Sequence, residues 1–390
     1  MTPDVLVIGA GPAGCVAALA LARAGVRVRL IDRASFPRAK LCGDTLNPGV
    51  LAIVDRLGVG RDVRARARPI TGMLVTGPGG RAIAADYPGD LPGMAIERRD
   101  FDRLLVEAAV AAGVEFMPGV HATAPLLAAR GARVAGARIG HGRRETAMRA
   151  SLVIAADGRY SRLASALGLA RFAAAPKRWA FGAYFVDVDG LTSRGEMHIR
   201  ADGYTGVAPL GQGVTNVCVV RERQHLAPGG PACADRAIAD ALARDPMLRE
   251  RFARARQVSR AVALGPLAVD ASAAGCPGLL LAGDAAGFID PMTGDGLRFA
   301  MRGGELAAEA ALAELETRTP AHERLRAARA REFSGKWRLN RALRALVASP
   351  RAVELAAALA SCWPAPVRLL VALAGDLRVA RRARLPPGGP

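Results

Sequence analysis

The chain has 390 residues, of which 51% are hydrophobic, and a formal net charge of +19. This length holds two domains with a sizeable core, and no uncharged apolar run reaches the about 18 residues that a membrane-spanning helix needs. The basic excess is almost all arginine, because Lys occurs only at positions 40, 177 and 336, and the arginines are spread along the chain. We therefore expect no nucleic-acid partner.

The first predicted elements form a nucleotide-binding unit. Residues 5–8 are a short apolar run typical of a strand buried on both faces, and Gly9-Ala-Gly11-Pro-Ala-Gly14 follows directly. Gly9 allows a sharp turn, Gly11 lets a pyrophosphate approach the backbone, and Gly14 lets a helix pack closely on the strand. The N-terminus of that helix offers unpaired N–H groups to phosphates.

The order of the next residues strengthens this interpretation. The helix is expected to stop at Gly25, and residues 26–31 are predicted to form a second strand with Asp32 at its end. An acidic residue in that place accepts hydrogen bonds from ribose hydroxyls and repels a 2′-phosphate. The strand–turn–helix–strand–acid order predicts a dinucleotide site, and the alternative is a structural glycine turn.

The middle of the chain predicts an antiparallel sheet. Residues 71–95 hold Gly-Pro-Gly-Gly between β-like runs, which indicates a hairpin, and residues 100–112 are predicted to be a helix. Strand-like runs are predicted at 132–138, 152–155, 181–188, 196–199, 206–209 and 215–220. A helix is predicted over 237–254, and we expect residues 178–263 to form a separate substrate sheet.

A second glycine-rich segment lies late in the chain. Residues 279–281 are predicted to be a core strand, and Asp284 lies just beyond its carboxyl end, where open α/β sheets bind ligands. Gly294 and Gly296 precede an amphipathic run that begins at Leu297, which predicts a helix N-terminus able to stabilise negative charge. The alternative is an ordinary strand–loop–helix with an N-capping aspartate.

The remaining residues are predicted to be helices interrupted by Pro350, Pro364 and Pro366. Arginines alternate with apolar residues from 324 to 344, and residues 378–384 form a basic cluster. Two interpretations stay open, namely the solvated faces of packed helices and a weak peripheral membrane contact that gives access to a lipid substrate. The scattered Cys and His residues predict reduced thiols and no metal site.

Three further segments carry a family resemblance. Two segments are similar to those of prenyl reductases. Their Phe-Pro-Arg-x-Lys-x-Cys-Gly loop corresponds to Phe36-Pro-Arg38-Ala-Lys40-Leu-Cys42-Gly43. Their Arg-x-x-Phe-Asp-x-x-Leu segment corresponds to Arg98-Arg-Asp-Phe101-Asp102-Arg-Leu104. Asp157-Gly158 resembles the Asp-Gly motif of flavin hydroxylases. Together with the glycine segments, over about three-quarters of the chain, they resemble FAD-dependent oxidoreductases of the geranylgeranyl reductase-like and aromatic hydroxylase-like superfamily.

The resemblance implies FAD as cofactor and assigns roles to individual residues. Asp32 would bind the adenosine ribose, Arg98 would bind the pyrophosphate or ribityl chain, and Asp157 and Gly158 would lie close to the pyrophosphate. Asp284 would bind a ribityl or phosphate-linked hydroxyl group. The implied cofactor-binding residues are Gly9, Gly11, Ala13, Gly14, Asp32, Arg33, Cys42, Gly43, Arg98, Asp157, Asp284, Gly296 and Leu297.

The substrate region departs from the prenyl reductases. Their Tyr-x-Trp-x-Phe-Pro motif corresponds here to Tyr204–Pro209, where Gly206 and Ala208 replace the Trp and the Phe. The loss of two aromatic walls favours a monooxygenase that uses NADH or NADPH and O₂ on a phenolic or polyketide-like molecule. Tyr204 and Trp179 are its expected substrate contacts, and no catalytic acid or base is assigned. The halogenase motif Trp-x-Trp-x-Ile-Pro does not fit residues 178–182, which disfavours halogenation.

Two alternatives to the monooxygenase are an FAD-dependent reductase of isoprenoid C=C bonds, and a non-catalytic, flavin-bearing protein of lipid surfaces. The expected fold is α/β, with a Rossmann-type parallel sheet, an antiparallel substrate sheet and C-terminal helices. We expect a cytoplasmic protein with an aromatic or lipid-like small-molecule substrate. The expected parts are a discontinuous FAD-binding domain (1–70, 98–170 and 263–316), a substrate domain (71–97 and 171–262), C-terminal helices (317–384) and a flexible tail (385–390).

Overall fold

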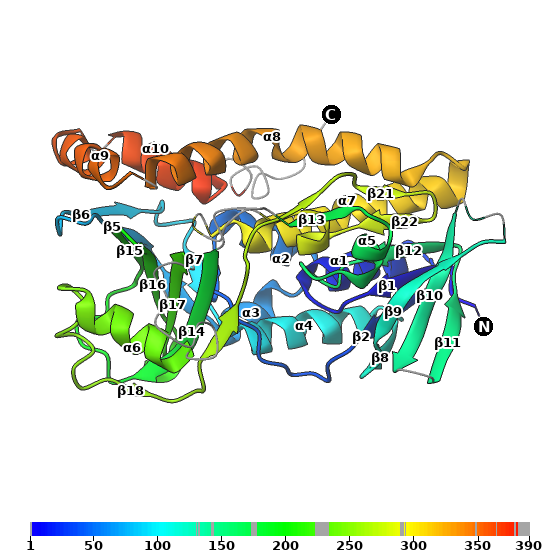
Figure 1. Ribbon diagram of the computed structural model, residues 1–390, viewed down its shortest axis with the longest axis horizontal. Coiled ribbons are helices and arrows are strands. Elements are labelled where there is room, and N and C mark those ends of the chain that lie inside the picture. The colour runs from blue at the N-terminus through cyan, green and yellow to red at the C-terminus, as the bar shows by residue number, and fades with distance from the viewer. Residues whose placement is uncertain are drawn as a thin grey trace.

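The computed structural model describes most of the chain. The described residues are 2–129, 131, 133–141, 144–172, 178–222, 234–288, 292, 294–347, 349–363, 365–377 and 380. Two large sheets lie side by side along the long axis of the molecule, and a layer of C-terminal helices runs along both (Figure 1). The predicted α/β fold class is confirmed.

The first large sheet has six strands in the order β21-β22-β12-β1-β2-β8, and every neighbouring pair is parallel except β21–β22. The strands are β1 (Val5–Ile8), β2 (Val28–Asp32), β8 (Glu115–Pro118), β12 (Leu152–Ala155), β21 (Gly275–Cys276) and β22 (Leu279–Leu281). The N-terminal strand and the late strand β22 both pair with β12, so the two glycine-rich segments follow strands of one sheet.

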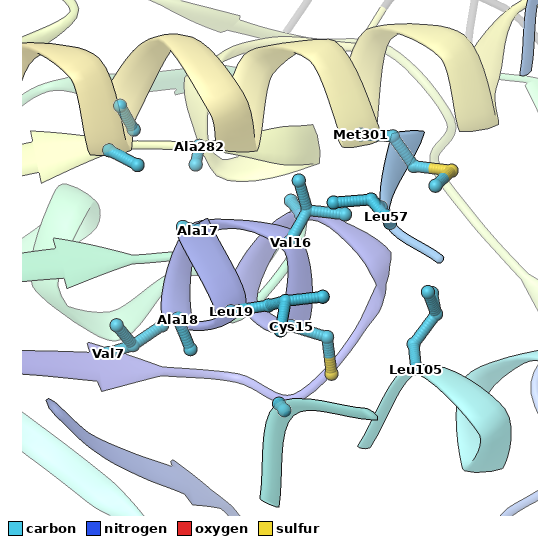
Figure 2. Close-up of a cluster of buried hydrophobic side chains, with 14 of the residues drawn as sticks. Val7, Cys15, Val16, Ala17, Ala18, Leu19, Leu57, Leu105, Ala282 and Met301 are labelled. Carbon is cyan, nitrogen blue, oxygen red and sulfur yellow. The ribbon is translucent and has the colours of Figure 1, made fainter. Parts of the chain in front are cut away.

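Side chains of this sheet alternate between two cores, as the period of a strand requires. Val5 and Val7 pack with α1 (Pro12–Arg23), α4 (Arg98–Ala111) and α7 (Gly296–Thr317). Figure 2 shows α1 between α7, which carries Met301, and α4, which carries Leu105. Leu6 and Ile8 pack on the opposite face. That face is covered by α5 (Arg162–Ala166) and by the antiparallel strands β9 (Ala122–Leu127), β10 (Val134–His141) and β11 (Arg144–Arg149).

The second large sheet has eight strands and comes from two separate parts of the chain. It includes β5 (Gly72–Thr76), β6 (Ala82–Asp86), β14 (Arg178–Val186), β15 (Arg194–Arg200), β16 (Gly203–Pro209), β17 (Thr215–Glu222), β18 (Arg256–Gln257) and β19 (Val262–Leu264). The predicted hairpin is β5–β6, and β5 joins the later strands by parallel pairing with β15. All its other pairings are antiparallel, as the sequence predicted.

One predicted helix is wrong in its second half. The helix expected over 237–254 is α6 (Ala234–Arg244), and turns follow it. Pro246 explains the end, because proline has no N–H group and disfavours helical backbone at the residue before it. The Asp245 carboxylate instead accepts a hydrogen bond of 2.9 Å from the N–H of Met247. Helix α6 packs on one face of the eight-stranded sheet, which leaves the other face open to the functional site.

Shorter elements connect the two sheets. They are the strands β3 (Thr45–Leu46), β4 (Arg68–Ile70), β7 (Gly93–Ala95), β13 (Ala170–Phe172) and β20 (Val269–Ala271), and the helices α2 (Pro48–Arg56) and α3 (Gly60–Arg66). Strands β3 and β4 flank β7 in a three-stranded sheet, and β13 pairs with β20. Strand β3 directly follows the Cys42-Gly43 loop, so this small sheet anchors the loop between the two large sheets.

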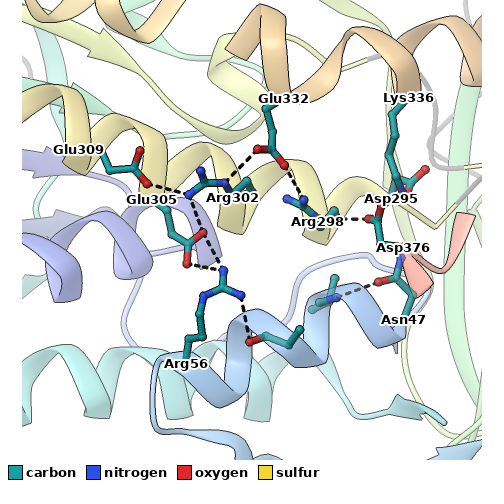
Figure 3. A network of polar contacts seen from close by, with 12 residues as sticks. Asn47, Arg56, Asp295, Arg298, Arg302, Glu305, Glu309, Glu332, Lys336 and Asp376 are labelled. Atoms are coloured by element: carbon teal, nitrogen blue, oxygen red, sulfur yellow. Dashed lines mark hydrogen bonds and ion pairs between the residues drawn. The ribbon is translucent and has the colours of Figure 1, made fainter. Parts of the chain in front are cut away.

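The C-terminal layer consists of α8 (Ala321–Val347), α9 (Pro350–Cys362) and α10 (Ala365–Ala374). Helix α8 runs along α7, and Figure 3 shows Arg298 and Arg302 of α7 both contacting Glu332 of α8. Pro350 begins α9, and the Ser349 hydroxyl caps it by accepting from the N–H of Ala352. The tail 385–390 and all of the basic cluster 378–384 except Ala380 lie outside the described residues. Within the described part of the chain, no helix is both long and apolar enough to cross a bilayer.

Candidate active site

A cavity of about 430 Å³ lies between the two large sheets. One end is formed by the start of α1, the Cys42-Gly43 loop and the start of α7. Its wall is the open face of β14–β17, and residues of α8, α9 and α10 also line it. The glycine-rich segments from both ends of the sequence therefore meet at one end of a single cavity.

The first glycine turn is held by close backbone contacts. Gly9 has φ +98°, and a Cβ atom on it would lie 2.4 Å from the Ala156 carbonyl oxygen. A Cβ on Gly14 would lie 1.9 Å from the Gly9 oxygen. A Cβ on Gly11 would meet only the Arg38 side chain, at 3.6 Å, so Gly11 leaves free space in front of the helix. These contacts match the predicted roles of Gly9 in the turn, Gly11 in the approach of the ligand and Gly14 in helix packing.

Asp32 holds the same turn from the end of β2. Its carboxylate oxygens accept hydrogen bonds from the N–H groups of Ala10, at 2.7 Å, and Ala34, at 2.8 Å. The side chain is buried, and Asp32 is not among the cavity-lining residues. The structure thus shows Asp32 ordering the glycine loop, and its predicted bond to a ribose stays a prediction.

Arg98 places a buried positive charge at the cavity. Its Nε lies 2.6 Å from Asp102 Oδ1, and Arg38 Nη2 lies 3.2 Å from the other oxygen of Asp102, which is fully buried. Burial by itself lowers the pKa of Arg98, but the attraction of Asp102 raises it above the ordinary range. Arg98 is therefore charged, and it also lines the cavity where an anion can approach.

The other implied cofactor residues divide into two groups. Those that line the cavity are Gly11, Ala13, Cys42, Gly43, Arg98, Asp284, Gly296 and Leu297. Arg33 and Asp157 are not among the lining residues, and Arg33 is exposed. Asp157 accepts a hydrogen bond of 3.2 Å from the N–H of Arg162 at the start of α5, whereas its neighbours Gly158 and Arg159 line the cavity.

These residues fit a dinucleotide such as FAD. Helix α1 begins at Pro12, and no side chain caps its N-terminus at Gly11. The first N–H groups of an α-helix have no partner within the helix, so here they are available to a pyrophosphate. The positive charge of Arg98 and the space in front of Gly11 complete an anion cradle at this end of the cavity.

Of the two predicted substrate contacts, Tyr204 lines the cavity and Trp179 does not. Tyr204, Gly206 and Ala208 of β16 line the cavity, so the positions that lost their aromatic side chains do face it. Trp179 does not line it, because its neighbour Ala180 faces the cavity and side chains alternate along β14. Trp179 instead packs over Gly265, where an added Cβ would lie 2.5 Å from the indole ring.

The sequence did not identify Asp44 as a site residue. Asp44 Oδ2 accepts hydrogen bonds from Tyr184 Oη, at 2.8 Å, and from Asn216 Nδ2, at 2.7 Å, while Oδ1 accepts one from the N–H of Arg98, at 3.1 Å. Asn216 Nδ2 also donates to the Cys42 carbonyl, at 3.0 Å. Asp44 follows Cys42-Gly43 directly, but its partners lie 140 and 172 positions later, beyond the reach of any motif.

The burial of Asp44 makes stability pH-dependent. Burial raises its pKa from 3.8 to about 7, even though its hydrogen bonds favour the carboxylate. Between about pH 4 and about pH 7, the Asp44 carboxyl group therefore keeps its proton in the folded state but has lost it in the unfolded chain. Stability falls as pH rises from about 4 to about 7, by up to about 4 kcal/mol for this group.

We expect Asp44→Asn to remove this part of the pH dependence, because an amide does not ionise. The measurement is urea unfolding of the FAD-free protein at about pH 5 and about pH 8. Asp62→Asn, at an exposed position of α3, is the control and should leave the wild-type dependence in place. An Asp44→Asn protein that loses as much stability between these pH values as the wild type would contradict the assignment.

Comparisons with known proteins agree with this site. The FAD binding domain family matches residues 2–334. The chain is 31% identical over 319 residues to a digeranylgeranylglycerophospholipid reductase of Methanoculleus marisnigri, covering 79% of this chain and 76% of that protein. It is 32% identical over 320 residues to a menaquinone reductase of Mycobacterium tuberculosis, covering 78% and 76%.

Solved structures show the same fold. A flavin-dependent brominase superposes with a TM-score of 0.84 at 22% identity, over 96% of this chain and 94% of that chain. A geranylgeranyl bacteriochlorophyll reductase-like protein of Thermoplasma acidophilum superposes with a TM-score of 0.78 at 24% identity, over 98% and 95%. The resemblance stated from the motifs is confirmed, and the chain belongs to the FAD binding domain family as an FAD-dependent oxidoreductase.

Proposed function

We propose that this protein uses FAD to reduce a C=C bond of an isoprenoid or similarly long apolar substrate. The main observation in support is that the cofactor residues and apolar residues of the C-terminal helices line the same cavity. Gly11 and Leu297 belong to the first group, and Leu343, Leu370 and Val371 of the C-terminal helices belong to the second. The two curated relatives support this choice, since both are named as reductases and one name specifies geranylgeranyl groups.

The chain contributes binding, orientation and proton control. The α1 N-terminus and Arg98 would hold the pyrophosphate, and the open face of β14–β17 would exclude water from a bound substrate. FAD, once reduced by NADH or NADPH as the proposed electron donor, would supply the hydride. Saturation of a C=C bond also consumes one proton. We assign that proton to the Asp44 carboxyl group, which lies in the cavity wall and whose pKa of about 7 suits proton exchange near neutral pH.

A monooxygenase is the second candidate. It is favoured by Gly206 and Ala208, which line the cavity at the positions where prenyl reductases carry aromatic side chains. A wider wall there suits a phenolic or polyketide-like ring. This candidate needs O₂ in addition to NADH or NADPH, and that requirement separates it from the reductase.

Turnover in a sealed oxygen-electrode cell tests both candidates. The FAD-loaded protein is given NADH or NADPH and either a geranylgeranyl lipid or a phenol, and products are identified by mass spectrometry. The proposal expects a product that has gained two hydrogen atoms, with no substrate-dependent use of O₂. A product that has gained one oxygen atom establishes the second candidate. Bound flavin that neither donor reduces, with any substrate, favours a non-catalytic flavin-bearing protein of lipid surfaces.

A further inference from the structure

Helices α9 and α10 are apolar on two opposite faces. Their inner face, which includes Val353, Ala356, Leu370 and Val371, lines the cavity. The large side chains of their outer face are exposed to solvent. This outer apolar face consists of Leu355 (62% exposed), Leu359 (61%), Trp363 (68%), Leu369 (56%) and Leu373 (37%).

Exposed large hydrophobic side chains are concentrated on the outer apolar face. Of the eleven exposed large hydrophobic side chains among the described residues, five lie between Leu355 and Leu373. The helical spacing explains the concentration, since Leu355 and Leu359, like Leu369 and Leu373, are four residues apart and share one side of a helix. Large apolar side chains are normally covered, and none of the described residues covers this face.

Exposed arginines lie close in the chain to the residues of the outer apolar face. Arg351 lies one helical turn before Leu355, and Arg368 lies beside Leu369. Both are exposed, as are Arg338 and Arg341 near the end of α8, and none of the four forms an ion pair with the described acidic residues. Residues 321–377 contain ten Arg and Lys against four Asp and Glu. An apolar face with a basic margin is complementary to the acyl chains and phosphates of an anionic lipid surface.

Trp363 strengthens the choice of a lipid surface over another protein. It is the most exposed of these side chains and lies between α9 and α10, where the chain turns. Tryptophan is favoured at the boundary between lipid headgroups and acyl chains, because its ring is apolar and its N–H group still finds a polar partner. Figure 1 shows α9 and α10 at the edge of the molecule above β5 and β6, where a flat surface can reach them.

We propose that the outer apolar face docks on an anionic lipid surface. The pair α9–α10 lies between that surface and the cavity, because the same two helices line the cavity on their inner face. A long apolar substrate then passes from the lipid to the cavity beside these helices without crossing water. The docking proposal does not depend on the proposed function, whereas the path of the substrate rests on it.

Sedimentation with vesicles tests the docking on the full, FAD-loaded chain. The vesicles contain phosphatidylcholine alone or phosphatidylcholine with phosphatidylglycerol. We expect binding to the mixed vesicles, weaker binding to neutral ones, and a loss of binding as salt increases. The double variant Leu355→Glu/Leu369→Glu should weaken binding by about tenfold or more, because two leucines no longer enter the lipid and two negative charges are added.

A matched control comes from the opposite end of the molecule. Leu127 on β9 is 46% exposed, and Leu127→Glu adds one negative charge, half the change of the double variant, far from α9 and α10 (Figure 1). It should bind vesicles almost as the wild type does. Flavin absorbance and the unfolding midpoint show whether the two variants are folded. Neither variant changes a cavity-lining residue, so both should still bind FAD.

Three results would overturn the docking proposal. The first is that the wild-type protein does not bind anionic vesicles. The second is that the double variant binds vesicles as well as Leu127→Glu does. The third is that the wild type is a dimer that does not bind vesicles, and that the double variant is a monomer. The last would assign the face to a second copy of the chain. Turnover of a detergent-dispersed substrate is measured separately, so that failure of the proposed reaction is distinguished from failure of the docking.

Discussion

Replacing Asp102 with alanine is expected to destabilise the protein by about 3–5 kcal/mol. Asp102 is fully buried and lies 2.6 Å from Arg98 Nε and 3.2 Å from Arg38 Nη2. Its removal leaves the buried Arg98 guanidinium without a counter-charge, and the cost of that unpaired charge dominates the loss. The measurement is the free energy of unfolding from urea titration of the FAD-free protein.

Added FAD sharpens this experiment. If Arg98 also neutralises the pyrophosphate, bound FAD restores part of the lost counter-charge. The destabilisation by Asp102→Ala should then be smaller in the FAD-loaded protein than in the FAD-free protein. An equal destabilisation in both forms would argue against the contact between Arg98 and the pyrophosphate.

The same helix offers a matched control. Arg103 and Glu107 form an ion pair at the same spacing of four residues, but their side chains are 31% and 54% exposed. Solvent screens such a pair, so Glu107→Ala should cost less than about 1 kcal/mol. A cost for Asp102→Ala as small as that for Glu107→Ala would show that the buried pair does not hold this part of the fold.

The glycine turn should separate folding from cofactor binding. Gly11→Val is expected to reduce FAD affinity by about a hundredfold or more while changing the free energy of unfolding by less than about 1 kcal/mol. A Cβ at Gly11 has space within the protein, since its nearest contact is at 3.6 Å, but the added methyl groups occupy the approach to the phosphates. Gly14→Val should instead prevent folding, because its Cβ would lie 1.9 Å from the Gly9 backbone oxygen.

Gly335→Ala is the control for these substitutions. A Cβ at Gly335, within α8, would meet nothing within 4 Å. Alanine is favoured there over glycine by about 0.5–1 kcal/mol, so a slight gain in stability with unchanged FAD affinity is expected. Fluorescence titration of the FAD-free proteins with FAD measures the affinity. Wild-type affinity in Gly11→Val would remove the α1 N-terminus from the cofactor site.

The local parts of the site followed from short stretches of sequence. The strands over residues 5–8 and 279–281, and the glycine turn at Gly9, Gly11 and Gly14, depend on residues within a few positions of one another. Their apolar runs and backbone requirements could be recognised without knowing the rest of the fold. The end of α6 was also local, since Pro246 marks it, and the prediction overlooked that signal.

The residues that complete the site depended on the tertiary structure. Asp44 acquires its raised pKa from burial beside Tyr184 and Asn216, which strands β14 and β17 bring to the Cys42-Gly43 loop. The alternation along β14 says that Trp179 and Ala180 face opposite sides, but the packing of the two sheets decides which side is the cavity. Helices α9 and α10 are apolar on both faces, and only their position over the cavity distinguishes the inner face from the outer. Local sequence specifies backbone geometry, whereas burial and charge environment arise from residues that are distant in the chain and adjacent only in the fold.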